Sequence, residues 1–134
     1  MGNIQTQPSP NQIWYTSTDG AVIKPAARYF SAIIVSNSYD SGWGIITFNR
    51  PLTDIGWNAF LDCPTLASII FPMGVTEIAE GVCQNCTALE KAIMPDSVTK
   101  IGAHAFAGCS SLKRIVIPES CTNIGENAFD SHTE

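Results

Sequence analysis

Charged side chains are scarce in this chain of 134 residues: they make up 14% of the sequence, whereas hydrophobic residues make up 45%. Seven residues are lysine or arginine, twelve are aspartate or glutamate, and the formal net charge at pH 7 is −5. Domains that bind nucleic acid usually carry a basic patch or stripe, so this composition argues against nucleic acid as a partner. The high hydrophobic content predicts an ordered globular chain rather than a disordered one.

The sequence also lacks a long hydrophobic run. No stretch approaches the roughly 20 consecutive apolar residues that a membrane-spanning helix needs, so we expect no membrane insertion. Residues 1–12 are polar and contain no apolar segment of the kind that forms the centre of a signal peptide. The length is that of one domain, which is enough to bury most of its apolar surface.

What the sequence has in abundance is self-similarity. Lines of 23 residues that begin at Leu52, Val75, Val98 and Cys121 agree in column after column, without an insertion. The clearest columns contain Thr53, Thr76, Thr99 and Thr122; Ile55, Ile78, Ile101 and Ile124; Cys63, Cys86 and Cys109; and Leu66, Leu89 and Leu112. A fixed period of this length is the signature of a solenoid, in which each repeat stacks on the next.

Each repeat contains a short strand followed by proline, as in "IIFP", "AIMP" and "IVIP". Because side chains alternate along a strand, we expect Ile115 and Ile117 to point inward and Val116 to point outward. Equivalent strands of neighbouring repeats should pair in parallel, about 4.8 Å apart. The segment "IGAHAFAGC" must turn the chain back, and we expect a short helix there, with its alanine and phenylalanine side chains packed inward.

The residues before Leu52 predict a β-rich cap. Subtracting one period maps Leu66 onto Trp43, so "GWGIITF" is expected to supply the strand half of a zeroth repeat. The preceding run "AIIVSNSY" is followed by "DSG", which predicts a hairpin, and "IWYTSTDGAVIKP" predicts another hairpin with its turn at "DG". The expected division is a flexible arm at 1–10, the cap at 11–51, and repeats at 52–74, 75–97, 98–120 and, in part, 121–134.

The stretch "VTKIGAHAFAGCSSLKRIVIPES" resembles the BspA-like leucine-rich repeats of bacterial surface proteins, and "LTDIGWNAFLDCPTLASIIFP" is similar to them. The resemblance covers residues 12–130 and includes the core Leu112-x-x-Ile115-x-Ile117. It implies an α/β solenoid: a right-handed superhelix of 23-residue repeats, with parallel strands on one face, short helices or turns on the other, and an N-terminal β-hairpin cap. It also implies a surface or secreted interaction protein, often adhesive, without catalytic residues or cofactor.

The five cysteines are the residues most suggestive of chemistry. Cys83-x-x-Cys86 has the spacing of a metal or redox pair, but a zinc site needs about four ligands and no second close pair exists. Cys86 shares a column with Cys63 and Cys109, so we interpret the thiols as free and as small buried hydrophobes. His104 stands in a polar, variable column and is expected to face solvent on the turn. We therefore expect no catalytic, metal or cofactor site.

The outward strand positions form the candidate binding surface. One column contains Thr47, Ile70, Ile93 and Val116, and the column beside it contains Ile45, Ser68, Lys91 and Arg114. Exposed apolar residues beside two cations suit a contact surface, although β-branched residues also simply suit strands, and both interpretations stay open. The candidate partner-binding residues are Thr47, Ser68, Ile70, Lys91, Ile93, Arg114 and Val116.

Together these features predict a non-catalytic cell-surface or secreted binding or adhesion module. Its sheet face would meet a protein or glycan partner, and the chain would be a monomer or weakly self-associating. The alternative is a structural fragment of a longer repeat array, with binding elsewhere. An enzyme is a third possibility, for which the sequence offers no recognisable nucleophile, base and acid.

Overall fold

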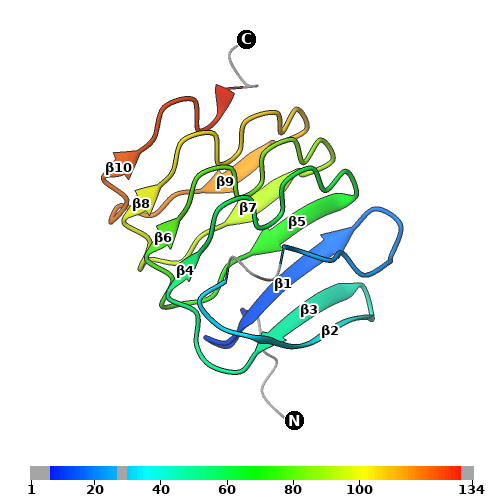
Figure 1. The fold of residues 1–134 in the computed structure, drawn as a ribbon. Helices are drawn as coiled ribbons and strands as arrows, with labels where there is room; N and C mark the ends of the chain where they lie inside the picture. The colour runs from blue at the N-terminus through cyan, green and yellow to red at the C-terminus, as the bar shows by residue number, and fades with distance from the viewer. Residues whose placement is uncertain (1–6, 27–29, 131–134) are drawn as a thin grey trace.

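The computed structural model describes residues 7–26 and 30–130, which form a solenoid built from two sheets (Figure 1). The strands are β1 (Gln12–Ser17), β2 (Ile34–Asp40), β3 (Trp43–Phe48), β4 (Asp54–Ile55), β5 (Leu66–Ile70), β6 (Glu77–Ile78), β7 (Lys91–Ile93), β8 (Lys100–Ile101), β9 (Arg114–Val116) and β10 (Asn123–Ile124). The larger sheet has the order β2-β3-β1-β5-β7-β9, and the smaller sheet has the order β10-β8-β6-β4.

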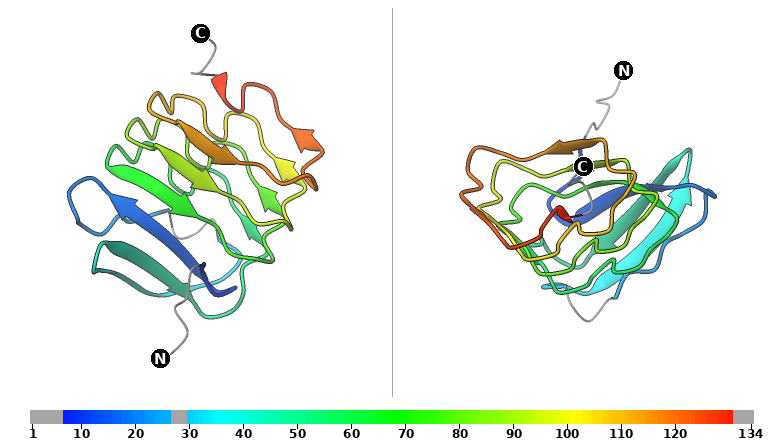
Figure 2. Two further views of the ribbon diagram at one scale, coloured as in Figure 1. Left: turned by 180° about the vertical axis from the view of Figure 1, so that it is seen from behind. Right: turned by 90° about the horizontal axis from the view of Figure 1, so that it is seen from above.

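From β4 onward the chain alternates between the two sheets, so each repeat makes one coil of the solenoid (Figure 2). Strands β5, β7 and β9 pair in parallel, and Ile69, Ala92 and Ile115 lie opposite one another in that order. These partners are 23 residues apart, which confirms the predicted repeat length and the parallel pairing.

The predicted short helix at residues 101–109 is wrong, because this segment is a series of turns. Its backbone amides alternate between two kinds of acceptor. Phe106 N–H donates to the carbonyl of Ala128 on the neighbouring coil at 2.8 Å, whereas Ala107 N–H closes a turn onto the carbonyl of His104 at 3.1 Å. His104 and Gly108 have positive φ values of 59° and 79°, which a helix cannot contain. The inward packing is confirmed, since Ala105 and Phe106 are fully buried.

The smaller sheet was not foreseen from the sequence. Strands β4, β6 and β8 of this sheet each carry one buried isoleucine and one outward polar residue. The outward Glu77 and Lys100 form an ion pair at 3.8 Å. The threonine column reinforces it: Thr76 donates to the carbonyl of Thr53 from both its backbone N–H, at 2.9 Å, and its hydroxyl, at 3.2 Å. Hydrogen bonds between neighbouring coils therefore explain why threonine recurs at this position of the repeat.

The core lies between the two sheets and contains the repeated apolar columns. Ile117 departs from its expected inward place: it is 36% exposed, whereas its equivalents Phe71 and Met94 are 2% and 3% exposed. Ile124 is likewise 47% exposed, although the equivalent isoleucines of earlier coils are fully buried. Both belong to the last described coil, where β9 and β10 are edge strands with no described coil stacked on them.

The cap contains one of the two predicted hairpins. Strands β2 and β3 pair antiparallel with Asp40 opposite Trp43, so Ser41 and Gly42 form a two-residue turn, and both have the positive φ that such a turn requires. The other prediction is wrong: residues 21–26 form no strand, and β1 does not pair with them.

Strand β1 instead lies between β3 and β5, antiparallel to both (Figure 1). The expected zeroth-repeat strand, β3, thus belongs to the repeat sheet and runs in the same direction as β5, but it does not contact β5 as a neighbour. Ile13 and Tyr15 of β1 are fully buried, and Trp14 points to the other face of the sheet. The side chains of β1 therefore alternate between the two faces of the sheet, as those of the repeat strands do.

Residues 7–10, which the sequence placed in a flexible arm, lie against the cap. Pro8 is buried, Gln12 N–H donates to the carbonyl of Ser9 at 2.9 Å, and Leu52 N–H donates to the carbonyl of Pro10 at 3.0 Å. The remaining arm residues, 1–6, lie outside the described residues.

Candidate functional site

The outward face of the larger sheet presents a row of apolar side chains that crosses the strands. The strand registers align Ile45, Trp14, Ile70, Ile93 and Val116 in that order across β3, β1, β5, β7 and β9. We call these five residues the apolar row. Val116 lies at the edge of the sheet and is 43% exposed. Ile70 and Ile93, on β5 and β7, are half-buried.

A polar row lies beside the apolar row, two residues earlier on the parallel strands. It contains Thr16, Ser68, Lys91 and Arg114, which are aligned across β1, β5, β7 and β9. The hydroxyl groups of Thr16 and Ser68 are hydrogen-bonded at 2.6 Å. Lys91 and Arg114 are direct cross-strand neighbours, and like charges in that position repel each other. An anionic group bound over this pair would relieve the repulsion.

Six of the seven predicted binding residues therefore lie on three neighbouring strands, and Thr47 does not join them. Thr47 was expected beside Ile70, but it pairs with Gln12 of β1 and is separated from β5 by the width of that strand. The physical reason is the insertion of β1, which puts Trp14 in the position that Thr47 was expected to fill.

Sequence reasoning missed the two tryptophans of this face. Trp14 lies within the apolar row, and its ring packs against that of Trp43 with the centroids 5.6 Å apart and the planes inclined at 51°. Trp14 Nε1–H donates to Oε1 of Gln12 at 3.2 Å, and Trp43 is 37% exposed. The alternation of "IWYTS" could have shown that Trp14 faces away from Ile13 and Tyr15, but it could not show which strands flank it.

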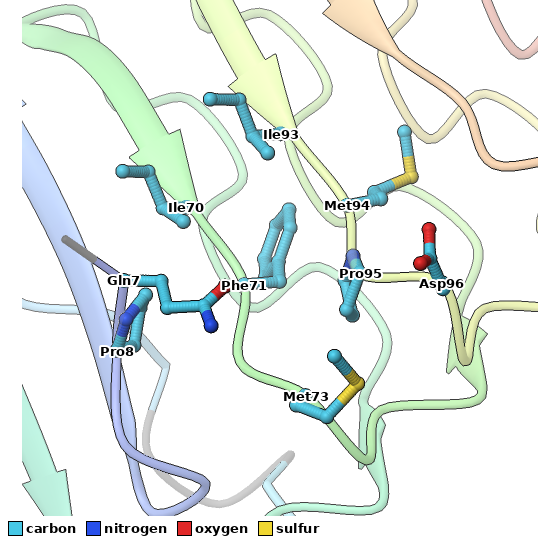
Figure 3. A pocket seen from close by; sticks show the side chains of 9 residues that line it. All are labelled: Gln7, Pro8, Ile70, Phe71, Met73, Ile93, Met94, Pro95 and Asp96. Carbon is cyan, nitrogen blue, oxygen red and sulfur yellow. The ribbon is translucent and has the colours of Figure 1, made fainter.

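A pocket of about 230 Å³ adjoins the apolar row at the ends of β5 and β7 (Figure 3). Its lining residues are Gln7, Pro8, Ile70, Phe71, Met73, Ile93, Met94, Pro95 and Asp96. Figure 3 shows Gln7 and Pro8 on one side and Pro95 and Asp96 on the other, with Met73 at the lower end of the view. The pocket was not predicted, because nothing in the sequence places residues 7 and 8 against these strands.

The cysteines are free, as predicted, and Cys83, Cys86 and Cys109 are buried. The thiol of Cys109 donates to the carbonyl oxygen of Cys83 at 3.1 Å, and that of Cys86 to the carbonyl oxygen of Phe60 at 3.1 Å. Burial raises the pKa of Cys109 from 9.0 to about 12, so this thiol is neutral at pH 7. These groups act as small core hydrophobes that bridge coils, rather than as nucleophiles.

Within residues 7–26 and 30–130, no three histidine, cysteine, aspartate or glutamate side chains come together in a way that could hold a metal ion. His104 is half-buried on its turn rather than fully exposed to solvent. No helix in this part of the chain has the length and apolar character to cross a bilayer.

Comparison with known proteins agrees with the geometry. Residues 36–134 match the family described as BspA type leucine rich repeat region, in six copies. The chain belongs to this family. A crystal structure of a leucine-rich repeat protein from Bacteroides ovatus ATCC 8483 is similar to the chain, with 34% sequence identity and a TM-score of 0.55. No curated protein matches.

The match to the Bacteroides ovatus protein covers 66% of this chain and 22% of that protein, so the chain spans about a fifth of its length. The BspA-type match begins at Ser36, within β2, which places part of the cap inside the repeat region. Membership of the family indicates a protein-interaction repeat module built on a non-enzymatic scaffold.

Proposed function

We propose that this chain is a non-catalytic binding module, displayed on the bacterial cell surface or secreted, whose larger sheet contacts a protein partner. The observation that carries the proposal is the alignment of Ile70, Ile93 and Val116 in one row, with Lys91 and Arg114 in the next. An apolar strip beside charged groups is the usual composition of a protein contact, with an apolar centre and a polar rim. The surface location rests on the association of BspA-type repeats with bacterial surface proteins.

The experiment starts from a partner found by screening immobilised extracellular matrix proteins and a glycan array with the purified chain. Affinity is then measured for Ile93→Glu, which puts a charge in the middle of the apolar row. We expect a loss of at least about tenfold, because an unpaired charge is desolvated at the centre of the contact. Val35→Glu is the matched control: Val35 is 64% exposed on β2, which is three places from β5 and four from β7 in the order of the sheet.

Three outcomes are distinguishable. A partner bound less well by Ile93→Glu but normally by Val35→Glu supports the proposal. A ligand found on the glycan array, with the same dependence on Ile93, would assign the face to glycans instead of proteins. If both variants bind the partner as tightly as the unmodified chain does, the partner does not bind to this face.

A second candidate is a structural part of a longer repeat array, with binding elsewhere. It is favoured by Ile117 and Ile124, inward-column residues that are 36% and 47% exposed on the last described coil and that a further coil would cover. Ile117→Glu would then leave partner binding unchanged and lower the stability of a longer piece of the array.

A further inference from the structure

The chemistry of the partner can be inferred from the layout of the sheet face, an inference that rests on the proposed function. We propose that the partner contributes an extended protein segment with one bulky apolar side chain and a carboxylate two residues away from it. The apolar side chain fills the pocket beside Ile70 and Ile93, and the carboxylate lies over Lys91 and Arg114.

The pocket fits a single side chain. Its volume of about 230 Å³ lies below the roughly 300–1,000 Å³ of pockets that hold small molecules. Phe71, Met73 and Met94 line it from the coil ends, and Ile70 and Ile93 form its border with the apolar row (Figure 3). Methionine side chains are flexible and polarizable, so Met73, which is 48% exposed, can adapt to an aliphatic or an aromatic group.

The charges around the pocket are asymmetric. Lys91 precedes Ile93 by two residues on β7, and its cross-strand neighbour Arg114 adds a second cation. Asp96 lines the pocket beyond Pro95, three residues after Ile93 and so at the other end of this segment from Lys91. A bound segment therefore meets positive charge on one side of its anchor and negative charge on the other, within a chain whose net charge is −5. This arrangement selects an acidic group on the Lys91 side and disfavours one on the Asp96 side.

The spacing matches an extended chain. Two residues along a strand span about 6.6 Å, both on β7 and on a segment that lies along it. In an extended segment, side chains two residues apart also point to the same face. An apolar anchor that enters the pocket at its Ile93 border and a carboxylate at that separation can thus reach the pocket and the Lys91–Arg114 pair together. A neutral glycan would lack the charge, and a charged glycan would lack the apolar anchor.

The test uses the whole chain labelled with ¹³C at the methionine methyl groups, because Met73 and Met94 both line the pocket. The probes are two capped pentapeptides with leucine in the middle and serine on each side of it. One has glutamate first and lysine last, and the other has these two residues exchanged, so both chain directions are sampled. Control peptides replace leucine with serine, or glutamate with glutamine.

We expect one of the two leucine peptides to shift the Met73 and Met94 methyl signals, and its serine version to leave them unmoved. Replacing glutamate with glutamine should weaken binding about fivefold at low salt, as expected for one exposed ion pair. Lys91→Gln combined with Arg114→Gln should have the same effect on the acidic peptide and none on its glutamine version. Lys24→Gln combined with Lys100→Gln removes the same net charge elsewhere and should change nothing.

Two results would overturn the inference: no movement of either methyl signal with both leucine peptides, or equal affinity for the glutamate and glutamine versions. Its failure can be told apart from failure of the proposed function. If the peptides fail while Ile93→Glu still abolishes binding of a screened partner, the face binds and the partner chemistry inferred here is wrong. If Ile93→Glu has no effect on that partner, the face itself is wrong.

Discussion

The ring of Tyr15 on β1 lies directly over Gly44 on β3, and a methyl group at position 44 would overlap its carbon atoms. The Tyr15 hydroxyl donates to Oδ1 of Asn37 at 2.8 Å and accepts from the backbone N–H of Ile23 at 3.1 Å. Asn37 in turn donates to the carbonyl of Ile23 at 2.8 Å. This network joins β1, β2 and the segment after β1, and it fixes β1 in its place between β3 and β5 in the larger sheet.

Gly44→Ala should therefore destabilise the chain by about 2–3 kcal/mol, because the added methyl group displaces the buried Tyr15 ring. Gly20→Ala is the control: nothing lies within 4 Å of its added carbon, and its φ of 69° alone should cost about 1 kcal/mol. Urea unfolding followed by circular dichroism measures both. Equal losses would mean that β1 does not pair with β3 as described.

A second prediction concerns the packing of phenylalanine side chains between neighbouring coils. Phe106 is fully buried and stacks on Phe129, with ring centroids 5.5 Å apart and planes 3° from parallel. Phe106→Ala should cost about 3–5 kcal/mol of unfolding free energy, since it leaves a cavity between coils. His104→Asn, two residues away, should change stability by less than about 0.5 kcal/mol, because asparagine tolerates the positive φ of 59° found there. Similar small losses in denaturant melts would show that the repeat register is misassigned.

A third prediction concerns the hydrogen bonds of the Ser97 hydroxyl, which join two neighbouring coils. The Ser97 hydroxyl accepts from Gly74 N–H at 3.0 Å and donates to the carbonyl of Val75 at 2.7 Å, so it ties two coils together. Ser97→Ala should lower the unfolding free energy by about 1–2 kcal/mol, since the part-buried bond to the Val75 carbonyl and the exposed bond from Gly74 N–H are both lost. Ser110→Ala, on an exposed turn, should stay within about 0.5 kcal/mol of the unmodified chain. A Ser97→Ala melt that coincides with that of Ser110→Ala would contradict this role of Ser97.

The repeat sheet could be predicted because its register follows from sequence spacing alone. Once the period is known, Ser68, Lys91 and Arg114 must lie side by side, and so must Ile70, Ile93 and Val116. The place of β1 could not be predicted in this way. Its antiparallel pairing depends on the fit of Tyr15 over Gly44, two residues that are far apart in sequence and outside the repeat pattern.

The turns show a second limit of sequence reasoning. The pattern of alanine and phenylalanine in "IGAHAFAGC" suits one face of a helix as well as one side of a turn. What decides between them is the next coil, whose carbonyl groups accept the amide hydrogens of His104 and Phe106, which a helix would use internally. The pocket depends in the same way on Pro8, whose place across the pocket from Pro95 is a tertiary arrangement without a local signal.

The buried thiols predict how stability depends on alkaline pH. Burial raises the pKa of Cys109 from 9.0 to about 12, and burial also raises the pKa of Cys83. Below about pH 9 these thiols are protonated in both the folded and the unfolded chain, so their contribution to stability is complete. Between about pH 9 and pH 12 the unfolded chain releases the Cys109 proton that the folded chain keeps, and this group lowers stability by up to about 1.4 kcal/mol per pH unit. Cys83 acts in the same direction.

Cys109→Ala should therefore flatten the loss of stability between about pH 8 and about pH 10.5, whatever it costs at neutral pH through lost packing. The measurement is the unfolding free energy from urea melts at both pH values, in the presence of a non-thiol reductant. Val98→Ala is the matched control, because it truncates another fully buried side chain that does not ionise. It should lower stability equally at both pH values and keep the slope of the unmodified chain. If Cys109→Ala keeps that slope as well, the thiol ionises as easily in the folded chain as in the unfolded one, and its enclosure between coils is incorrect.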